Sequence, residues 1–519
     1  MPGLRLRGWV QGATVLALLG CTGPARVMTR PEEPPPAHAI LAEVVPVSDP
    51  APSVPPAAAA GPCDGQGDVS RFVVAHLNDM QARYGELVAG RSRYAYVAGY
   101  LRALKAENAS TLVLDAGDDY EKGSIAELRS MGEATRRMIQ ALPIDARTIG
   151  NHDFAYGEEA VVRDATWSAH PVLAANVHRD PARGASPFSS FVRIDVGCVR
   201  VGITGLVTTN YGSSDLPTRE PFDGVFRQDD RYAEVLEAVV REHRAEVDVM
   251  IALDHLGFWQ DVELAGRVPG VDLFVGGHSE DLVMAPYGIQ RGDGSRAWVV
   301  QAGHFARTVG RADLAFNRKD HTLSIERYGI VTIDESQPVA EDVEALAREV
   351  ERDAAPDARN PVAVLANAVP AGKPMTDLVW RAVQQRWGAD AMLLGRDLFW
   401  DGLARGPITL ERLYDAVLVQ REPAGTSGFS SLYVLPLRGS ELLVLRARLI
   451  AGPMFSFYAP DVIDPARTYR LVIEKRALEN PGVAMYGSPA PMHGRWGGEL
   501  IDVLEPYARW RTARGLTLD

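Results

Sequence analysis

Five short motifs in the sequence place polar side chains directly after apolar runs. In "TIGNHDFAYG", Asn151, His152 and Asp153 stand side by side after a glycine. The other four motifs end on carboxylates or imidazoles, at Asp79, Asp118, His255, and His278 with Glu280. Carboxylate, amide and imidazole groups bind divalent cations, and imidazole also transfers protons near neutral pH. The set therefore indicates a metal site with a histidine, His152, available for proton transfer or charge stabilisation.

Each motif alone also has a simple structural explanation. Asp79 and Asp118 could be turn or cap residues, and His255 and His278 could be buried histidines with satisfied hydrogen bonds. An ordered set of five such motifs is harder to attribute to turn chemistry. We therefore interpret the set as functional.

The residues before these motifs predict buried strands. "RFVVAHLND", "TLVLDAGDD", "DARTIGNHD", "VDVMIALDHLG" and "VDLFVGGHSED" begin with β-rich apolar runs. Apolar residues with helical spacing lie between them, at 94–104 and 232–239. This alternation predicts an α/β layered domain, in which the carboxyl ends of strands converge on one crevice. The donors suit two divalent cations bridged by one carboxylate, and without thiolates they favour Mn²⁺, Zn²⁺, Fe or Co²⁺.

The bulk composition sets wider limits. A chain of 519 residues with 46% hydrophobic and 23% charged residues predicts a globular protein of at least two domains. The net charge of −13 argues against a nucleic-acid polymer as partner. A small anionic substrate would need metal ions or local arginines.

The N-terminal residues predict export rather than a folded element. Arg5 and Arg7 precede a short apolar run that ends in "LLGC", which resembles a bacterial lipobox with Cys21 as the lipidated residue. A plain cleaved signal with an incidental cysteine is the alternative. The Pro- and Ala-rich stretch that follows predicts an extended tether. Cys63 and Cys198 could form a disulfide in an oxidising compartment, but the sequence does not show that they meet.

The motifs "HLND", "LDAGDDYEKGS", "IGNHDFAYG", "IALDHLG" and "VGGHSED" resemble the calcineurin-like metallophosphatase domain of bacterial 5′-nucleotidases. A weaker similarity to the family's C-terminal substrate domain runs through "GPITLERLYDAV", "LYVLPLRGSELLVLRARL" and "TYRLVI". The implied fold is α/β, a layered β-sandwich flanked by helices and followed by a smaller α/β substrate domain. The implied segments are a lipoprotein signal peptide at 1–21, a linker at 22–68, the metallophosphatase domain at 69–335, a connecting helix at 336–357 and a divergent C-terminal domain at 358–519.

The resemblance also implies roles for individual residues. Asp118 would bridge two ions, His152 would face the phosphoryl oxygens and leaving group, and Asp153 would orient His152. The implied metal ligands are Asp79, Gln81, Asp118, Asn151, His255, His278 and Glu280.

The chain departs from the family pattern at the first ion. The family usually has histidine where this chain has Gln81, and many members have histidine where it has Glu280. Gln81 is a weak neutral donor, while Glu280 adds negative charge. We therefore expect the first ion to be held more loosely, in a harder and more Mn²⁺-like site, whereas the second site is intact.

The C-terminal domain departs further. Trp400 occupies the place of the family's arginine, the paired glycines are absent, and both aromatic residues of the base clamp are missing from their expected positions. Phe399, Trp400, Phe455, Phe457 or Tyr458 could stack a base instead, although such residues more often belong to a core. The substrate-binding residues are therefore unknown, and adenosine recognition is not predicted.

The expected function is that of a metal-dependent phosphoric monoester hydrolase of 5′-nucleotidase type, acting in nucleotide catabolism with two divalent ions. The expected location is the periplasm or the outer membrane, with an N-terminal lipid anchor contacting the membrane and a small phosphorylated substrate. One alternative is a catalytically weakened surface lipoprotein that keeps the fold. Another is a hydrolase of a non-nucleotide ester, similar to the thiosulfohydrolase branch of the superfamily.

Overall fold

The computed structural model describes residues 67–121, 123–208, 225–399, 401–417, 430–449, 454–479, 484 and 492–519. The predicted signal peptide, most of the linker, Cys21, Cys63 and Trp400 lie outside these residues. Cys198 is disulfide-bonded. Among the described residues, no helix has the length and apolar character needed to cross a membrane.

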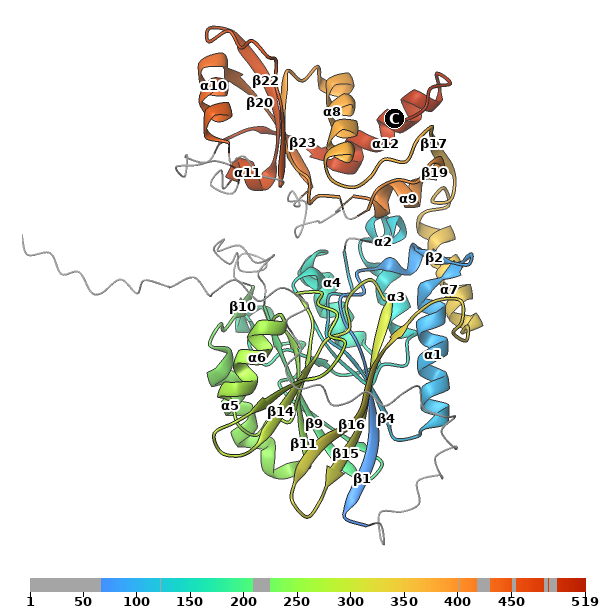
Figure 1. Cartoon of the computed structure of the whole chain (residues 1–519), viewed down its shortest axis with the longest axis vertical. Helices are drawn as coiled ribbons and strands as arrows, with labels where there is room; N and C mark the ends of the chain where they lie inside the picture. Colours follow the sequence, from blue (N-terminus) through green and yellow to red (C-terminus); the bar gives the residue numbers. More distant parts are fainter. Residues whose placement is uncertain are drawn as a thin grey trace, which may run out of the picture. The chain divides into compact units, whose positions relative to one another are not determined.

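Two six-stranded sheets form the first domain (Figure 1). The first sheet has the order β16-β15-β1-β4-β5-β6, and the second has the order β13-β14-β12-β11-β9-β8. The first sheet consists of β1 (Val69–Leu77), β4 (Thr111–Asp115), β5 (Ala146–Thr148), β6 (Val172–Leu173), β15 (Thr308–Asn317) and β16 (Thr322–Thr332). The second consists of β8 (Val192–Val196), β9 (Val199–Val207), β11 (Val249–His255), β12 (Leu273–Gly276), β13 (Tyr287–Gln290) and β14 (Arg296–Val300).

The sheets pack face to face, and each carries helices on its outer face. Alternate residues of β1 show why: Phe72 and Val74 join the core between the sheets, while Val73 and Ala75 join the core under the helices. A strand that is buried on both faces needs this continuous apolar run. Figure 1 shows α1 (Arg93–Glu107), α3 (Glu133–Gln140) and α7 (Glu341–Ala354) beside the first sheet, and α5 (Tyr232–His243) and α6 (Phe258–Arg267) beside the second.

The centre of each sheet is parallel. Strand β1 pairs in parallel with β4, and β4 pairs in parallel with β5. In the second sheet, β11 pairs in parallel with both β9 and β12. Antiparallel strands flank both centres. The loops after β1, β4 and β5 therefore leave one edge of the first sheet together, as the loops after β11 and β12 leave the second.

The C-terminal domain is a smaller α/β unit. Its five-stranded sheet has the order β21-β18-β22-β20-β23. The strands are β18 (Ala391–Gly395), β20 (Ser431–Arg438), β21 (Phe455–Tyr458), β22 (Thr468–Glu474) and β23 (Arg495–Glu499). Apolar residues of α8 (Lys373–Trp387) and α12 (Leu500–Thr512) pack in one core, and those of α10 (Gly439–Arg448) and α11 (Lys475–Glu479) in another. The predicted fold class is confirmed.

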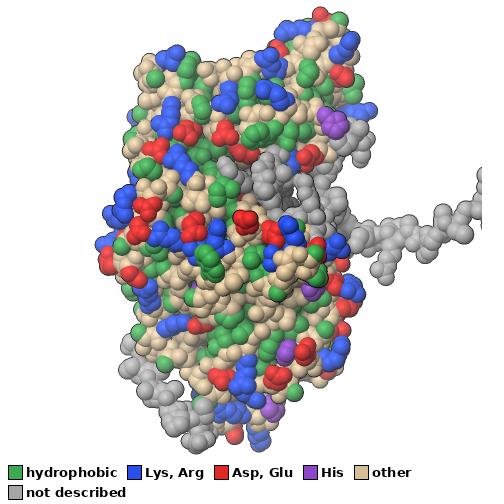
Figure 2. All heavy atoms as spheres, turned by 180° about the vertical axis from the view of Figure 1, so that it is seen from behind, with side chains coloured by type: hydrophobic (Ala, Val, Ile, Leu, Met, Phe, Trp, Pro, Cys, Tyr) green, Lys and Arg blue, Asp and Glu red, His purple; other side chains and the backbone are tan. Residues whose placement is uncertain are grey.

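The surface carries charges of both signs. On the face that Figure 2 shows, acidic and basic side chains are interspersed rather than separated. Exposed pairs such as Arg102 with Asp342 and Arg71 with Glu326 join neighbouring elements. Such pairs contribute little to stability individually, because water screens them.

Candidate metal centre

All five motifs lie at the carboxyl ends of central parallel strands. Asp79 follows β1, Asp118 follows β4, and Asn151 follows β5. His255 is the last residue of β11, and His278 follows β12 by two residues. The two sheets thus bring residues that are up to about 200 positions apart in the chain to one place, as the hydrogen bond from His278 N to Asp79 Oδ2 shows (3.0 Å).

One cluster joins the two sheets at the position predicted for the second ion. Asp118, His255 and His278 each offer one ligand atom, and these atoms lie within 4.8 Å of one another. Asp118 Oδ2 lies 3.1 Å from His255 Nε2. Asn151 Oδ1 lies 2.8 Å from His278 Nδ1. His255 Nδ1 donates to the carbonyl of Ala116 at 2.7 Å, which leaves Nε2 of this ring facing the cluster.

A second group of donors adjoins this cluster, where the first ion is predicted. Asp79 Oδ2 accepts hydrogen bonds from Asn78 Nδ2 at 2.7 Å and from His278 N at 3.0 Å. Gln81 Nε2 donates to Glu280 Oε1 at 2.9 Å. The remaining oxygens, Asp79 Oδ1 and Gln81 Oε1, are buried and have no hydrogen-bond partner among the described residues. Buried oxygens of this kind fit a cation, because an unpaired buried acceptor is costly.

The backbone is strained at the same positions. Asp79, Gln81, Asp118, His278 and Glu280 all have φ between 48° and 75°. Residues with a side chain seldom adopt this left-handed region, and each such residue costs about 1–3 kcal/mol. Strain of this kind persists where surrounding contacts hold it, and it clusters at binding and catalytic sites.

The electrostatics of the cluster also favour a bound cation. Burial raises the pKa of Asp79 to about 8, and the carboxylates of Asp118 and Glu280 add to this shift against the opposing effect of His255. Burial alone would lower the pKa of His255, but the neighbouring Asp118 and Asp79 raise it to about 9. The crowded carboxylates thus attract positive charge, which divalent cations would supply.

His152 lies beside the cluster but has a different partner from the predicted one. Its Nδ1 lies 2.7 Å from Glu121 Oε2, and its Nε2 lies 3.8 Å from Asp118 Oδ2. The Asp153 carboxylate accepts hydrogen bonds from the backbone N–H groups of Gly150, Asp118 (3.0 Å) and Asp119 (3.1 Å). Asp153 therefore holds the loops after β4 and β5 together.

Two neighbours of the site were not anticipated from the sequence. Glu121 belongs to the loop after β4, and "DDYEKGS" contains several acids with no spacing that singles it out. His304 Nδ1 lies 3.5 Å from Glu280 Oε2. Its segment is bound to the first motif, since Phe305 N donates to the carbonyl of Asp79 at 2.7 Å. The only sequence signal for His304 is a histidine after a strand and a glycine, in "QAGHF".

The aromatic candidates of the C-terminal domain are engaged in packing. Phe399 is buried in the core. Tyr458 stacks on Trp380 with ring centroids 5.3 Å apart, and its hydroxyl donates to Asp377 Oδ1 at 2.6 Å. Phe455 and Phe457 pack against the second core of this domain. Phe399 is therefore inaccessible to a base, whereas Phe455, Phe457 and Tyr458 are half-buried.

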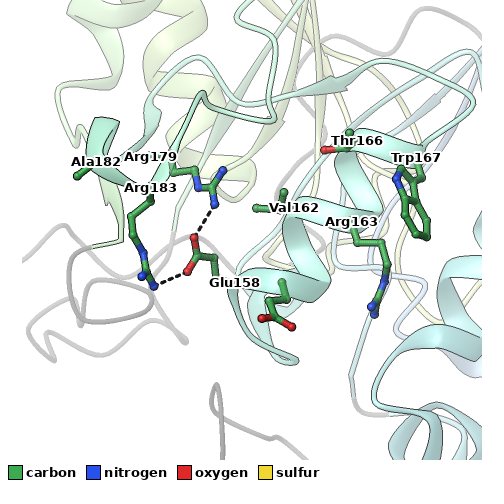
Figure 3. Close-up of a pocket in the computed structure, with 9 residues that line it drawn as sticks. Glu158, Val162, Arg163, Thr166, Trp167, Arg179, Ala182 and Arg183 are labelled. Atoms are coloured by element: carbon green, nitrogen blue, oxygen red, sulfur yellow. Dashed lines mark hydrogen bonds and ion pairs between the residues drawn. The ribbon is translucent and has the colours of Figure 1, made fainter.

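A surface pocket of about 680 Å³ lies apart from the cluster, beside α4 (Glu158–Trp167) (Figure 3). Figure 3 shows Glu158 between Arg179 and Arg183, and each guanidinium lies 2.6 Å from one of its oxygens. Because Glu158 neutralises much of their charge and none of the predicted ligands lines the pocket, we assign it no role in the site.

Comparison with known families identifies the first domain. Residues 72–279 match the calcineurin-like phosphoesterase family. These residues form a calcineurin-like phosphoesterase domain. The matched range contains four of the five motifs completely and ends within the last, between His278 and Glu280.

The chain is similar in sequence to a snake venom 5′-nucleotidase from Gloydius brevicauda. The two are 28% identical over 302 residues, which is 52% of this chain and 50% of the relative. The 5′-nucleotidase of Vibrio cholerae is 26% identical over 295 residues, which is 51% of this chain and 52% of the relative. The chain thus matches about half the length of these curated relatives, and the predicted relationship to 5′-nucleotidases is confirmed.

The similarity of fold extends beyond the calcineurin-like domain. A 5′-nucleotidase precursor from Thermus thermophilus superposes with a TM-score of 0.67 at 21% identity, covering 85% of this chain and 96% of that one. Because this coverage reaches past residue 335, the C-terminal domain shares the fold as well. The comparisons do not favour the two alternative interpretations of the sequence.

Proposed function

We propose that this protein is a metal-dependent phosphoric monoester hydrolase of 5′-nucleotidase type with two divalent cations. One observation carries the proposal: Asp118, from the first sheet, and His255 and His278, from the second, present ligand atoms within 4.8 Å of one another. Asp118 has a left-handed backbone and is buried, so this arrangement is built into the fold.

We assign the ligands in two sets that share Asp118. Asp79, Gln81 and Glu280 would complete the first set, and Asn151, His255 and His278 would complete the second. The unpartnered oxygens of Asp79 and Gln81 support the first set, since they are buried acceptors with no hydrogen bond among the described residues. The His255 ring, oriented by Ala116, supports the second.

The reaction follows from the chemistry of such a pair. When bound, two divalent ions lower the pKa of a water molecule from about 16 to about 7 and neutralise the phosphoryl oxygens, so that no protein base is required. His152 would protonate the leaving oxygen through Nε2, the nitrogen nearer to Asp118. The Asp153 carboxylate holds the loops after β4 and β5 together by accepting hydrogen bonds from their backbone N–H groups.

The expected substrates are phosphate monoesters, among them nucleotides. The support for nucleotides comes from the two nucleotidase relatives, each of which this chain matches over about half its length. Among the described residues of the C-terminal domain, Phe399 is buried in the core and Tyr458 stacks on Trp380, so these two do not form an open pair for a base. We therefore expect the protein to hydrolyse phosphate esters with weak selectivity for the base.

An activity screen tests this function. Protein loaded with Mn²⁺ or Zn²⁺ should release phosphate from nucleoside monophosphates and p-nitrophenyl phosphate and should contain two ions per chain. Replacing Asp118 with Asn should lower activity by more than about 100-fold and reduce the metal content, because the bridging charge is lost. The matched control is Asp195→Asn, which removes an exposed carboxylate paired with Arg193. No phosphate release from any mono- or diester, with one ion or none per chain, would refute the proposal.

We further propose that the protein is exported and tethered to a membrane through Cys21. The support is the "LLGC" sequence and the Pro/Ala-rich stretch after it. In a bacterial host, radiolabelled palmitate should label the full chain, and the Cys21→Ala variant should lose both the label and its recovery in the membrane fraction. Unlabelled protein in the soluble fraction would contradict this proposal and leave the catalytic one intact.

A further inference from the structure

The contacts of His152 point to a partner that belongs to a different segment of the chain. Glu121 Oε2 lies 2.7 Å from His152 Nδ1, and both side chains are at most 5% exposed. Glu121 precedes His152 by 31 residues and extends from the loop after β4, whereas His152 begins a short 3₁₀ turn after β5. The pair thus spans two neighbouring loops of the first sheet.

Local structure holds Glu121 in this position. Its backbone is left-handed, with φ of 66°, and its N–H group donates to Glu127 Oε1 at 2.6 Å. Glu127 is itself buried in α2 (Ile125–Ser130). A glutamate that adopts this unfavourable backbone conformation is held by surrounding contacts, and strain of this kind clusters where side chains must be aimed.

The neighbouring acid in the sequence is occupied by the backbone. The Asp153 carboxylate accepts hydrogen bonds from the N–H groups of three residues in the loops after β4 and β5. This arrangement ties the two loops together and gives Asp153 a structural role. Glu121 instead approaches the ring nitrogen of His152 that is farther from Asp118.

We propose that Glu121 is the positioning residue of His152, an inference that rests on the proposed function. By accepting a hydrogen bond from Nδ1–H, Glu121 sets one tautomer and one orientation of the ring and leaves Nε2 on the side of Asp118. The proton on Nε2 passes to the leaving oxygen as the phosphorus–oxygen bond breaks, and the ring keeps the proton on Nδ1. Before this transfer, the Glu121 carboxylate compensates the positive charge of the ring.

The dependence of the rate on the leaving group tests this role. A poor leaving group such as glycerol needs a proton, whereas p-nitrophenolate leaves without one. The near-isosteric Glu121→Gln variant should therefore lose about 100-fold in kcat/KM for glycerol phosphate but less than about 10-fold for p-nitrophenyl phosphate. A purely structural role would lower both values by the same factor, which would overturn the inference.

A kinetic double-mutant cycle supplies an independent readout. Because Glu121 acts through His152, Glu121→Gln should have little further effect on glycerol phosphate hydrolysis in a His152→Ala background. If the loss of kcat/KM in the double variant equals the product of the two single losses, the inference is overturned. The matched control is Glu344→Gln in α7, a buried glutamate that accepts a backbone hydrogen bond from Ser92 N at 2.8 Å. This control should leave the ratio of the kcat/KM values for the two substrates unchanged.

The controls also separate this inference from the proposed function. Thermal melting and metal content of Glu121→Gln should match those of the original protein, which excludes misfolding or ion loss as the cause. An original protein that hydrolyses neither ester would refute the proposed function and this inference together. An active protein whose Glu121→Gln variant loses both activities equally would refute this inference alone.

Discussion

At the scale of single residues, the first proposed metal position differs from the second in the strength of its donors. The second proposed set has two imidazoles and the carboxylate that both sets would share. The first would rely on Asp79, Glu280 and the neutral amide of Gln81, whose Nε2 also donates to Glu280. A neutral amide oxygen binds a cation more weakly than a carboxylate or an imidazole does. The two proposed ions should therefore dissociate at different metal concentrations.

Replacing Gln81 with His should strengthen the weaker position. An imidazole is a better ligand for Zn²⁺ or Mn²⁺ than a neutral amide, so we expect the first ion to bind at least about 10-fold more tightly. Isothermal titration of metal-free protein with the metal ion would measure this as a tighter dissociation constant for the weaker of the two binding steps, with the other step unchanged. The Gln337→His variant, at a half-buried position outside the cluster, provides the control. An unchanged weaker step would contradict the assignment of Gln81 as a ligand.

At the scale of elements, two loops meet so closely that no side chain fits between them. A Cβ atom on Gly277, in the loop after β12, would lie 2.7 Å from the carbonyl oxygen of Ala116 and 2.8 Å from His255 Nδ1. These are the two atoms whose hydrogen bond orients the His255 ring. The glycine thus allows the loops of the two sheets to close over the cluster.

A methyl group at this position should disturb the metal site. The Gly277→Ala variant should lose about 10- to 100-fold in metal affinity, because the His255 ring must move, and about 1–3 kcal/mol of stability from overpacking. Metal titration and thermal melting would measure the two effects. Gly292→Ala is the control, since a Cβ atom there meets nothing within 4 Å. Equal metal affinity in both variants would show that the close approach is unimportant.

Strand β1 contains a buried histidine outside the site. His76 is fully buried, its Nδ1 has no hydrogen-bond partner among the described residues, and Tyr328 Oη lies 3.4 Å from its Nε2. Burial lowers the pKa of His76 to about 3. The unfolded chain binds a proton at this histidine below about pH 6.5, whereas the folded protein does so only near pH 3, so acid favours the unfolded state.

The His76→Leu variant should remove this contribution to acid sensitivity. Between pH 6.5 and pH 4.5, the original protein loses up to about 1.4 kcal/mol of unfolding free energy per pH unit through His76, and the variant should not. Melting curves across this range would measure the difference in slope. The control is His321→Gln, at an exposed position, which should retain the slope of the original protein. Parallel slopes for His76→Leu and the original protein would contradict the prediction.

At the scale of the whole molecule, a buried ion pair links the calcineurin-like domain to the C-terminal domain. Arg83 Nη1 lies 3.2 Å from Asp415 Oδ1, and both side chains are at most 6% exposed. The Arg83 guanidinium also lies over the Phe305 ring, 4.2 Å from its centroid. Burial raises the pKa of Asp415 despite the opposing charge of Arg83. Breaking such a pair leaves an isolated buried charge, which costs more than removing both partners.

The Arg83→Met variant should therefore be destabilised by about 3–5 kcal/mol. Removing both charges, as Arg83→Met with Asp415→Leu, should restore part of this loss, because no carboxylate remains buried alone. Thermal melting would show which of the two variants is less stable. The exposed pair of Arg102 and Asp342 offers a matched control, since the same substitutions there should change stability by nearly zero. A double variant less stable than the single one would contradict the expected coupling.

The sequence by itself determined where the strands lie, the order of the motifs along the chain, and that the motifs come together at one edge. Continuous apolar runs bury both faces of β1, β4 and β11, and parallel strands place their carboxyl ends at one edge of a sheet. Both rules depend on local periodicity and on chain direction, which are readable from residue types. For the same reason the sequence predicts that Asp79, Asp118 and His255 are neighbours.

Only the tertiary structure decided which side chain contacts which at the ends of those strands. Glu121 rather than Asp153 approaches His152 Nδ1, His304 lies beside Glu280, and Phe399 is buried in a core. The first two contacts involve residues with a left-handed backbone, Glu121 and Glu280, where the φ angle changes the direction of the side chain. Neither residue type nor periodicity encodes that angle, because contacts from other loops hold it.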